Sequence, residues 1–173
     1  MNSSFVSFAD LKAGRLDQQI VGRILCFWPA RNVKKGGQLM GVYFLLIDEK
    51  STLKQSSIYV THLPKFEHAL RDGAMYRISA FDVTRSNTRF KLSDFHFSIR
   101  FTAATLFEEV EESFCVIPKE FFRLRTHEEL VLLANTNTEL PDVMGEVVST
   151  KAYRNGMSQT LERMLVHLRL QSI

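Results

Sequence analysis

The chain has 173 residues, of which 45% are hydrophobic, so it can bury a core and is not a wholly disordered polypeptide. No apolar run approaches the ~18 residues of a membrane-spanning helix, and residues 1–8 lack the basic and apolar regions of a secretory signal. Beneath the net charge of +3, residues 1–107 carry 15 Lys and Arg against 8 Asp and Glu, whereas residues 108–173 carry 7 against 11.

Five strands and one short helix are predicted in the first part of the chain. The strand segments are rich in β-branched and aromatic residues and are bounded by Gly, Pro and Asp. The predicted strands are residues 20–28, 39–47, 56–61, 75–83 and 89–101. The helix lies between the third and fourth strands, opens at Pro64 and ends at Gly73. This order predicts a mainly β fold, a five-stranded OB-fold barrel with the helix plugging its open end.

Alternation of residue types assigns faces to two of these strands. In the fifth strand, a period of two places the phenylalanines inward, at Phe95, Phe97 and Phe101. In the third strand, Tyr59 lies on the opposite face from Ile58. We therefore expect Tyr59 to point away from the core.

The character of the sequence changes beyond the predicted barrel. Residues 108–140 are predicted to be an acidic connector with a short helix, which begins at a capping box of Thr126 and Glu129. Residues 141–173 hold two predicted strands, and two strands alone make no stable sheet in water. We expect one OB-fold domain at residues 1–107, followed by the connector and the first strands of an incomplete second OB-fold.

The sequence lacks recognisable motifs for catalysis and for metal binding. It contains no phosphate-binding loop, nucleophile elbow or zinc-protease motif, and its histidines do not have metal-ligand spacing. A turn after the second strand explains the adjacent carboxylates of Asp48 and Glu49. Cys26 and Cys115 stand in apolar contexts, so we expect buried, reduced thiols in an intracellular protein. We expect no enzyme, no metal and no cofactor.

Three segments carry a family resemblance: GRILCFW at residues 22–28, LLIDE at 45–49 and GAMYRI at 73–78. Their order and spacing resemble the first OB-fold of the plant-type replication protein A large subunit, which has these patterns in its first strand, at the end of its second strand and at the entry to its fourth. The link at residues 121–145 resembles the family's connection into its next DNA-binding OB-fold. The resemblance covers roughly residues 18–173.

The resemblance implies single-stranded DNA binding, largely independent of sequence, in DNA replication, repair and recombination in the nucleus. It also implies partner subunits of the same complex, although the family's C-terminal zinc-bearing OB-fold, which assembles the subunits, is absent from this sequence. The residues alone leave two other functions open. These are an OB-fold that contacts proteins and an OB-fold that binds RNA.

Binding of single strands by an OB-fold needs exposed aromatic rings on which bases stack. Tyr59 is the first candidate because of its predicted outward face, and Phe90 is the second because Arg89 and Lys91 flank it. Both match stacking aromatics of the family. The alternatives are packing of Tyr59 against a neighbouring loop and a core position for Phe90 in the fifth strand. Trp28 is expected to pack at the barrel rim more readily than to stack on a base.

Two polar loops are predicted to hold the phosphate backbone, because they coincide with the binding rims of the fold. Lys and Arg would contact phosphates, while the Asn87 amide can donate and accept hydrogen bonds at a base edge. A basic surface fits a polyanionic partner, and the alternative for each residue is solvated surface charge. The candidates are Arg31, Lys34 and Lys35 in the first loop, and Arg85, Asn87, Arg89 and Lys91 around the second.

Overall fold

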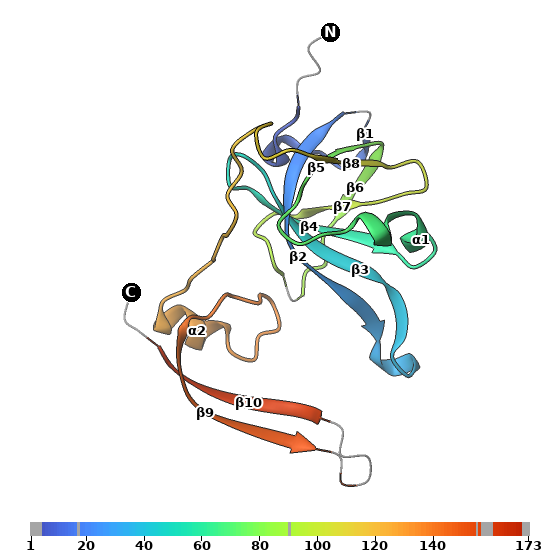
Figure 1. The fold of residues 1–173 in the computed structure, drawn as a ribbon. Helices are drawn as coiled ribbons and strands as arrows, with labels where there is room; N and C mark the ends of the chain where they lie inside the picture. Colours follow the sequence, from blue (N-terminus) through green and yellow to red (C-terminus); the bar gives the residue numbers. More distant parts are fainter. Residues whose placement is uncertain (1–4, 17, 90, 155, 157–160, 171–173) are drawn as a thin grey trace. The chain divides into compact units, whose positions relative to one another are not determined.

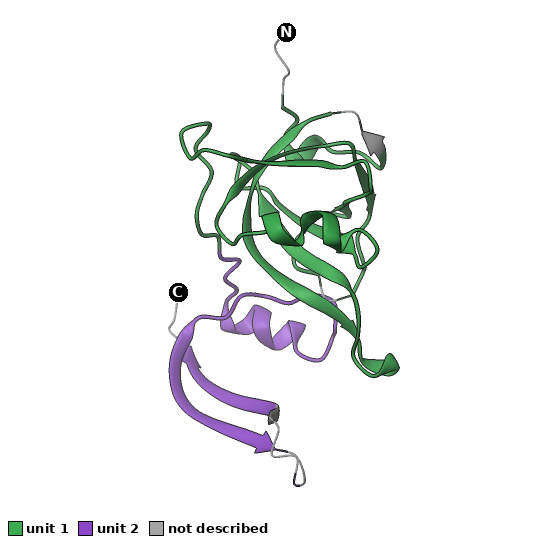
Figure 2. Cartoon of the chain, turned by 45° about the vertical axis from the view of Figure 1, so that its right-hand side comes forward, with its two compact units in different colours: residues 1–121 green, residues 122–173 purple. Residues whose placement is uncertain are grey.

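The computed structural model describes residues 5–16, 18–89, 91–154, 156 and 161–170. The chain forms two compact units, Met1–Phe121 and Phe122–Ile173, which Figure 2 distinguishes by colour. We call them unit 1 and unit 2. No helix in the described part of the chain is long and apolar enough to cross a membrane.

Unit 1 is built mainly of strands (Figure 1). Its strands are β1 (Gly14–Leu16), β2 (Ile20–Asn32), β3 (Gln38–Ile47), β4 (Leu53–Tyr59), β5 (Met75–Ser79), β6 (Phe81–Arg85), β7 (Phe97–Arg100) and β8 (Leu106–Val110). Its short helical segments are η1 (Phe8–Asp10), η2 (Val33–Lys35), α1 (Leu63–Phe66) and η3 (Glu67–Ala69). The predicted helix is confirmed as α1 and η3, but it ends at Ala69 and not at Gly73. Leu70 already has an extended backbone, and Gly73 lies in the turn that follows. Pro64 stands in the first turn of α1, where its missing N–H is not needed.

The strands of unit 1 form one sheet in the order β1-β6-β7-β4-β3-β2-β5-β8. Only β4 and β7 pair in parallel among the named strand pairs. β5 and β6 are far apart in this order, yet Ala80 alone separates them in the chain, so the sheet curls round on itself. Ala80 has a positive φ of 54° at this corner. The barrel, with its helix before β5, is the predicted OB-fold.

Aromatic side chains fill the barrel interior. The rings of Phe44 and Phe101 meet edge to face with centroids 5.3 Å apart. Phe66 of α1 lies 5.2 Å from Phe101, so the helix packs on the core of the barrel. Tyr76 stacks on Phe107 at 4.0 Å. Each such aromatic pair contributes about 0.5–1.5 kcal/mol beyond the apolar area that it buries.

Two predicted strands differ from those observed. The predicted fourth strand is two strands, β5 and β6, because the chain turns the barrel corner at Ala80. The fifth strand is shorter than expected, since β7 holds only Phe97–Arg100 and a polar connection precedes it. Phe95 lies in that connection and is half-buried, with the Nζ atom of Lys54 4.1 Å from its ring centroid.

The barrel domain continues further along the chain than predicted. The expected boundary at residue 107 lies inside β8, and β8 pairs with β5 along its whole length. After β8, Ile117 is buried in a small apolar cluster with residues of the barrel wall. The compact unit ends at Phe121. The first acidic residues of the predicted connector therefore belong to the barrel sheet.

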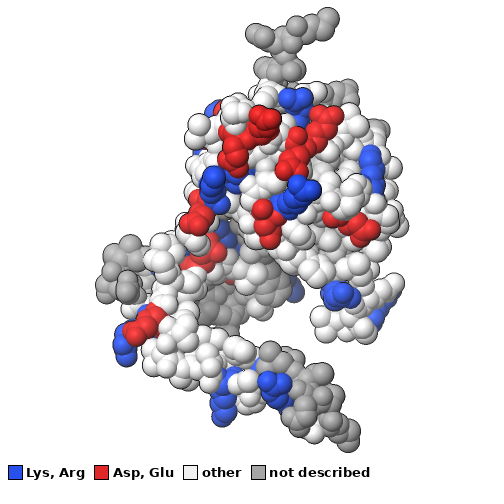
Figure 3. Space-filling model, in the orientation of Figure 1, with Lys and Arg blue, Asp and Glu red and all other residues white. Residues whose placement is uncertain are grey.

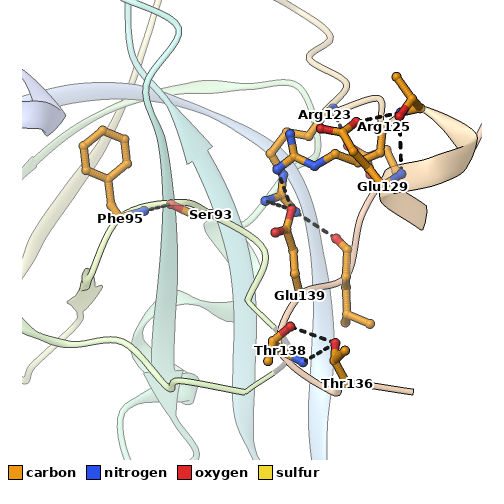
Figure 4. A network of polar contacts seen from close by, with 11 residues as sticks. Ser93, Phe95, Arg123, Arg125, Glu129, Thr136, Thr138 and Glu139 are labelled. Carbon is orange, nitrogen blue, oxygen red and sulfur yellow. Dashed lines mark hydrogen bonds and ion pairs between the residues drawn. The ribbon is translucent and has the colours of Figure 1, made fainter. Parts of the chain in front are cut away.

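Unit 2 contains α2 (His127–Leu133) and a hairpin of β9 (Gly145–Arg154) and β10 (Leu161–Leu170). The predicted capping box is confirmed: Thr126 Oγ1 accepts from Glu129 N at 3.3 Å, and Glu129 Oε2 accepts from Thr126 N at 2.7 Å. Arg125 donates to Glu139 at 2.7 Å in a polar network beside this helix (Figure 4). The hairpin is antiparallel, and among the described residues no third strand pairs with it.

Candidate nucleic-acid interface

Strand alternation gives the barrel wall an inner and an outer face. On β3, Val42 and Phe44 are buried in the core, so Tyr43 between them lies on the outer face. Paired residues of neighbouring strands point to the same side of the sheet, so the strand registers identify the other residues of this outer face. One row, which we call the outer row, takes a residue from each of β2, β3, β4, β7 and β6: Trp28, Tyr43, Ser57, Arg100 and Asp82. All its members are half-buried.

Tyr59 ends β4 on the same outer face, two residues beyond Ser57. It is 45% exposed, whereas its neighbour Ile58 is fully buried, so the predicted outward orientation is confirmed. The guanidinium of Arg100 lies 5.3 Å from the ring centroid of Tyr59, which is a cation–π contact. The Arg100 guanidinium therefore lies over one face of the Tyr59 ring. Stacking of a base on Tyr59 stays a prediction.

Small residues lie beside Tyr59 on the neighbouring strands. Gly41 on β3 pairs with Tyr59, and Ala30 on β2 pairs with Gly41. The backbone requires glycine here, because a Cβ on Gly41 would lie 2.1 Å from the carbonyl oxygen of Ile58, and its φ is 153°. No bulky side chain therefore projects from the outer face next to Tyr59.

β2 and β3 extend as a hairpin arm whose tip is η2 (Figure 1). The Asn32 side chain accepts from Lys34 N at 3.0 Å, and Arg31 Nη1 donates to Gly37 O at 3.1 Å. Arg31, Lys34 and Lys35 are all exposed. In the view of Figure 3, the protruding tip carries Lys and Arg side chains and no Asp or Glu. The predicted first loop is therefore a hydrogen-bonded turn with a basic surface.

The second predicted loop follows β6. Arg85, Asn87 and Arg89 are exposed, and Lys91 is half-buried. Asn87 Oδ1 accepts from Arg89 N at 3.1 Å, so the amide oxygen is engaged within the loop while its NH₂ group can still donate. Phe90, the second predicted stacking residue, lies outside the described residues.

The two basic loops stand at opposite ends of β4. The arm follows the Tyr59 end, because β3 approaches its tip beyond the Gly41–Tyr59 pair. The second loop is tied to the other end, where Ser93 Oγ donates to Leu53 O at 2.8 Å. β4 has seven residues. Its ends are therefore about 20 Å apart, which is room for a few nucleotides of an extended strand.

Arg23 of the GRILCFW segment is structural and is not part of this face. It is only 1% exposed, and its guanidinium donates to Gly73 O at 2.6 Å and to Ile117 O at 3.1 Å. It also forms an ion pair with Glu112, which raises the pKa of Arg23 and holds the pKa of the Glu112 carboxyl below its usual range. Arg23 thus fastens the segment after β8 to the barrel wall.

Lys54 is a second cation that does not reach the solvent. It is 1% exposed on the inner face of β4. Burial lowers the pKa of Lys54 to about 8, against the opposing effect of the Asp48 carboxylate. Asp48 itself is buried and accepts from Phe8 N at 2.8 Å and Thr52 N at 2.8 Å, which makes it a turn-forming residue as predicted.

Sequence reasoning missed three residues of the outer face. Tyr43 could have been found from its alternation with the apolar residues of β3, and Arg100 from its place beside the buried Ile99. Cys26 was expected to be buried but is exposed, because its pairing with the half-buried Leu45 places it on the same outer side. In the part of the chain that the structure describes, no cluster of His, Cys, Asp and Glu could hold a metal ion.

Among protein-family models, curated proteins and solved structures, only solved structures match the chain. No protein-family model and no curated protein matches the chain. A chain of a replication protein A heterotrimer bound to single-stranded DNA matches with 16% identity and a TM-score of 0.56, over 91% of this chain and 36% of that one. The shared architecture is the OB-fold.

Two further OB-fold structures are similar at lower scores. DNA-binding domain A of Saccharomyces cerevisiae replication protein A matches with 16% identity and a TM-score of 0.45, over 62% of this chain and 94% of that one. Schizosaccharomyces pombe Pot1pC bound to single-stranded DNA matches with 6% identity and a TM-score of 0.45, over 64% and 89%. The likeness to the heterotrimer chain is one of fold. The chain spans about a third of the length of the heterotrimer chain that it matches.

Proposed function

We propose that unit 1 binds single-stranded DNA, largely independently of base sequence, across the outer face of β3 and β4. The observation that carries this proposal is the exposed ring of Tyr59 beside Arg100, between two basic loops. Bases would stack on the ring, and the Lys and Arg side chains of the loops would contact phosphates. Every base has an aromatic face, so stacking gives little sequence preference.

The resemblance to the plant-type replication protein A large subunit extends this proposal to the role of the chain. We place it in DNA replication, repair and recombination in the nucleus, beside partner subunits and without catalytic activity of its own. The likeness of fold to the heterotrimer chain supports this extension. The absence of a catalytic motif in the sequence is consistent with a binding role.

The test is a titration of the full chain with a fluorescently labelled oligo(dT) of about 30 nucleotides, followed by anisotropy at several salt concentrations. If about four phosphates are contacted, log affinity falls with log salt at a slope of about −3. Absence of binding at low salt would contradict the proposal. The same titration with oligo(U) decides between DNA and RNA, and tighter binding of RNA would overturn the choice of substrate.

A further inference from the structure

The outer row contains an aromatic pair that the proposed function does not yet use. The rings of Trp28 and Tyr43 meet edge to face, with centroids 6.5 Å apart and an interplanar angle of 85°. They are direct cross-strand partners on β2 and β3. Both residues are half-buried, so each keeps some surface accessible to the solvent.

This pair lies outside the packed core of the barrel. Neither hydrophobic core cluster of the described residues includes Trp28 or Tyr43, even among the partly buried residues that pack against the clusters. The Phe44 ring next to Tyr43 fills the core from the other face of β3. The rings of Trp28 and Tyr43 therefore cover the outside of the sheet, where a binding surface uses aromatic area.

Tyr43 of this pair lies on the strand next to that of Tyr59, and Trp28 lies one strand further on. Tyr43 pairs with Ser57, so Tyr59 is its diagonal neighbour, and such neighbours lie about 7–8 Å apart. Gly41 and Ala30 occupy the positions beside Tyr59 and place no large side chain between the rings. This spacing suits aromatic platforms that take successive bases of one strand.

We propose that Trp28 and Tyr43 form a second stacking platform, which takes the base next to the one on Tyr59. This inference rests on the proposed function and assigns a further subsite to it. The bound DNA strand would pass from Tyr59 across the small residue Gly41 to Trp28 on β2. There the exposed Arg31 and Lys34 of the arm tip would contact its phosphates.

Trp28 is the only tryptophan of the chain, so its fluorescence reports on this subsite alone. The full chain is titrated with labelled oligo(dT) for anisotropy and, in parallel, with unlabelled oligo(dT) for tryptophan emission. We expect emission to be quenched along the same binding curve that anisotropy follows. Anisotropy that rises while emission stays unchanged would overturn the second platform and leave the proposed function standing. If neither signal changes, the proposed function itself fails.

Substitutions give a second readout. We expect Trp28→Leu and Tyr43→Leu each to weaken binding about tenfold, on the scale of one stacked base. Phe114→Leu is the matched control, because Phe114 is an exposed aromatic residue that packs edge to face on Phe5, outside the outer row. Thermal unfolding checks that each variant is folded. Unchanged affinity in a folded Trp28→Leu or Tyr43→Leu variant would count against the platform.

Discussion

At the residue scale, side chains of one type have different roles in this barrel. Arg100 lies on the outer face beside Tyr59, whereas Arg23 is buried and bonded to backbone carbonyls. Lys34 is exposed at the arm tip, whereas Lys54 is buried. The net positive charge of the first part of the chain therefore overstates the charge that faces a nucleic acid.

The Tyr59 ring is predicted to supply one stacked base. Tyr59→Ala should weaken binding of oligo(dT) by about 1–3 kcal/mol, because stacking on an aromatic ring contributes this much per base. Tyr59→Phe keeps the ring and its contact with Arg100, so its affinity should stay close to that of the natural chain. Anisotropy titrations of the three proteins measure the effect. Equal dissociation constants for all three would remove Tyr59 from the site.

Lys54 is predicted to make stability depend on pH. Its pKa is lowered to about 8 by burial, below its value in the unfolded chain, so between these values the unfolded chain binds more protons. The free energy of unfolding should therefore rise between about pH 8 and pH 10.5, by at most about 3 kcal/mol from this group.

The Lys54→Met variant keeps the volume of the side chain and removes its charge. The difference in unfolding free energy between this variant and the natural chain isolates Lys54 from other groups that titrate in this range. We expect the variant to be the more stable protein at pH 7 and the difference to shrink as pH rises to 10.5. Denaturant unfolding across the range measures it, and a difference independent of pH would contradict the assignment.

At the element scale, β8 and the segment after it complete the barrel. β8 pairs with β5, and Arg23 joins β2 to Gly73, Glu112 and Ile117. The arm of β2 and β3 has the opposite character, since it projects as a two-stranded hairpin (Figure 1). One element therefore contributes to stability and the other offers exposed cations.

Arg23→Ala tests how much the bonds between Arg23 and the segment after β8 stabilise the barrel. We expect the free energy of unfolding to fall by about 2–4 kcal/mol, because two carbonyl groups lose their donor and a cavity remains. Arg71→Ala is the control, since Arg71 forms an exposed ion pair with Glu109, and it should cost at most about 1 kcal/mol. Urea unfolding compares the two variants. Equal losses would show that Arg23 has no special role.

Removal of positive charge from the arm tip should weaken DNA binding through the loss of contacts with phosphates. The double substitution of Lys34 and Lys35 by Ala should weaken binding uniformly across oligonucleotide sequences and make the slope of log affinity against log salt shallower by about one to two. Lys50→Ala is a suitable control, because Lys50 is exposed in the turn after β3, at the far end of that strand from the arm tip. A shallower slope in the control, or an unchanged slope in the double variant, would contradict this role.

At the scale of the whole molecule, the chain divides into a barrel and a smaller unit with a helix and a hairpin (Figure 2). The barrel unit includes β8 and Ile117 and continues to Phe121, although the sequence suggested an end at residue 107. The boundary lies beyond residue 107 because β8 pairs with β5 and Ile117 is buried against the barrel wall, so the acidic segment belongs to the barrel unit.

Limited proteolysis of the full chain tests this boundary. We expect a protected fragment that ends near residue 121 and retains β8, because cleavage inside β8 requires the sheet to open. Mass spectrometry of the early fragments locates the cut sites. A stable fragment ending at residue 107 would show that β8 is dispensable.

The sequence by itself determined the local features of the fold. Alternation placed Tyr59 outside and Phe101 inside, the capping box at Thr126 began a helix, and strand order predicted the OB-fold. These features depend on residues close together in the chain, so their patterns are readable without distant contacts.

Only the tertiary structure decided which residues share the outer face and where the barrel ends. The outer row joins Trp28, Tyr43 and Arg100 through registers between strands that are distant in sequence. The burial of Lys54 and the bonds of Arg23 likewise depend on what packs against them. Register and burial arise from long-range pairing, whose energy no local pattern in the sequence records.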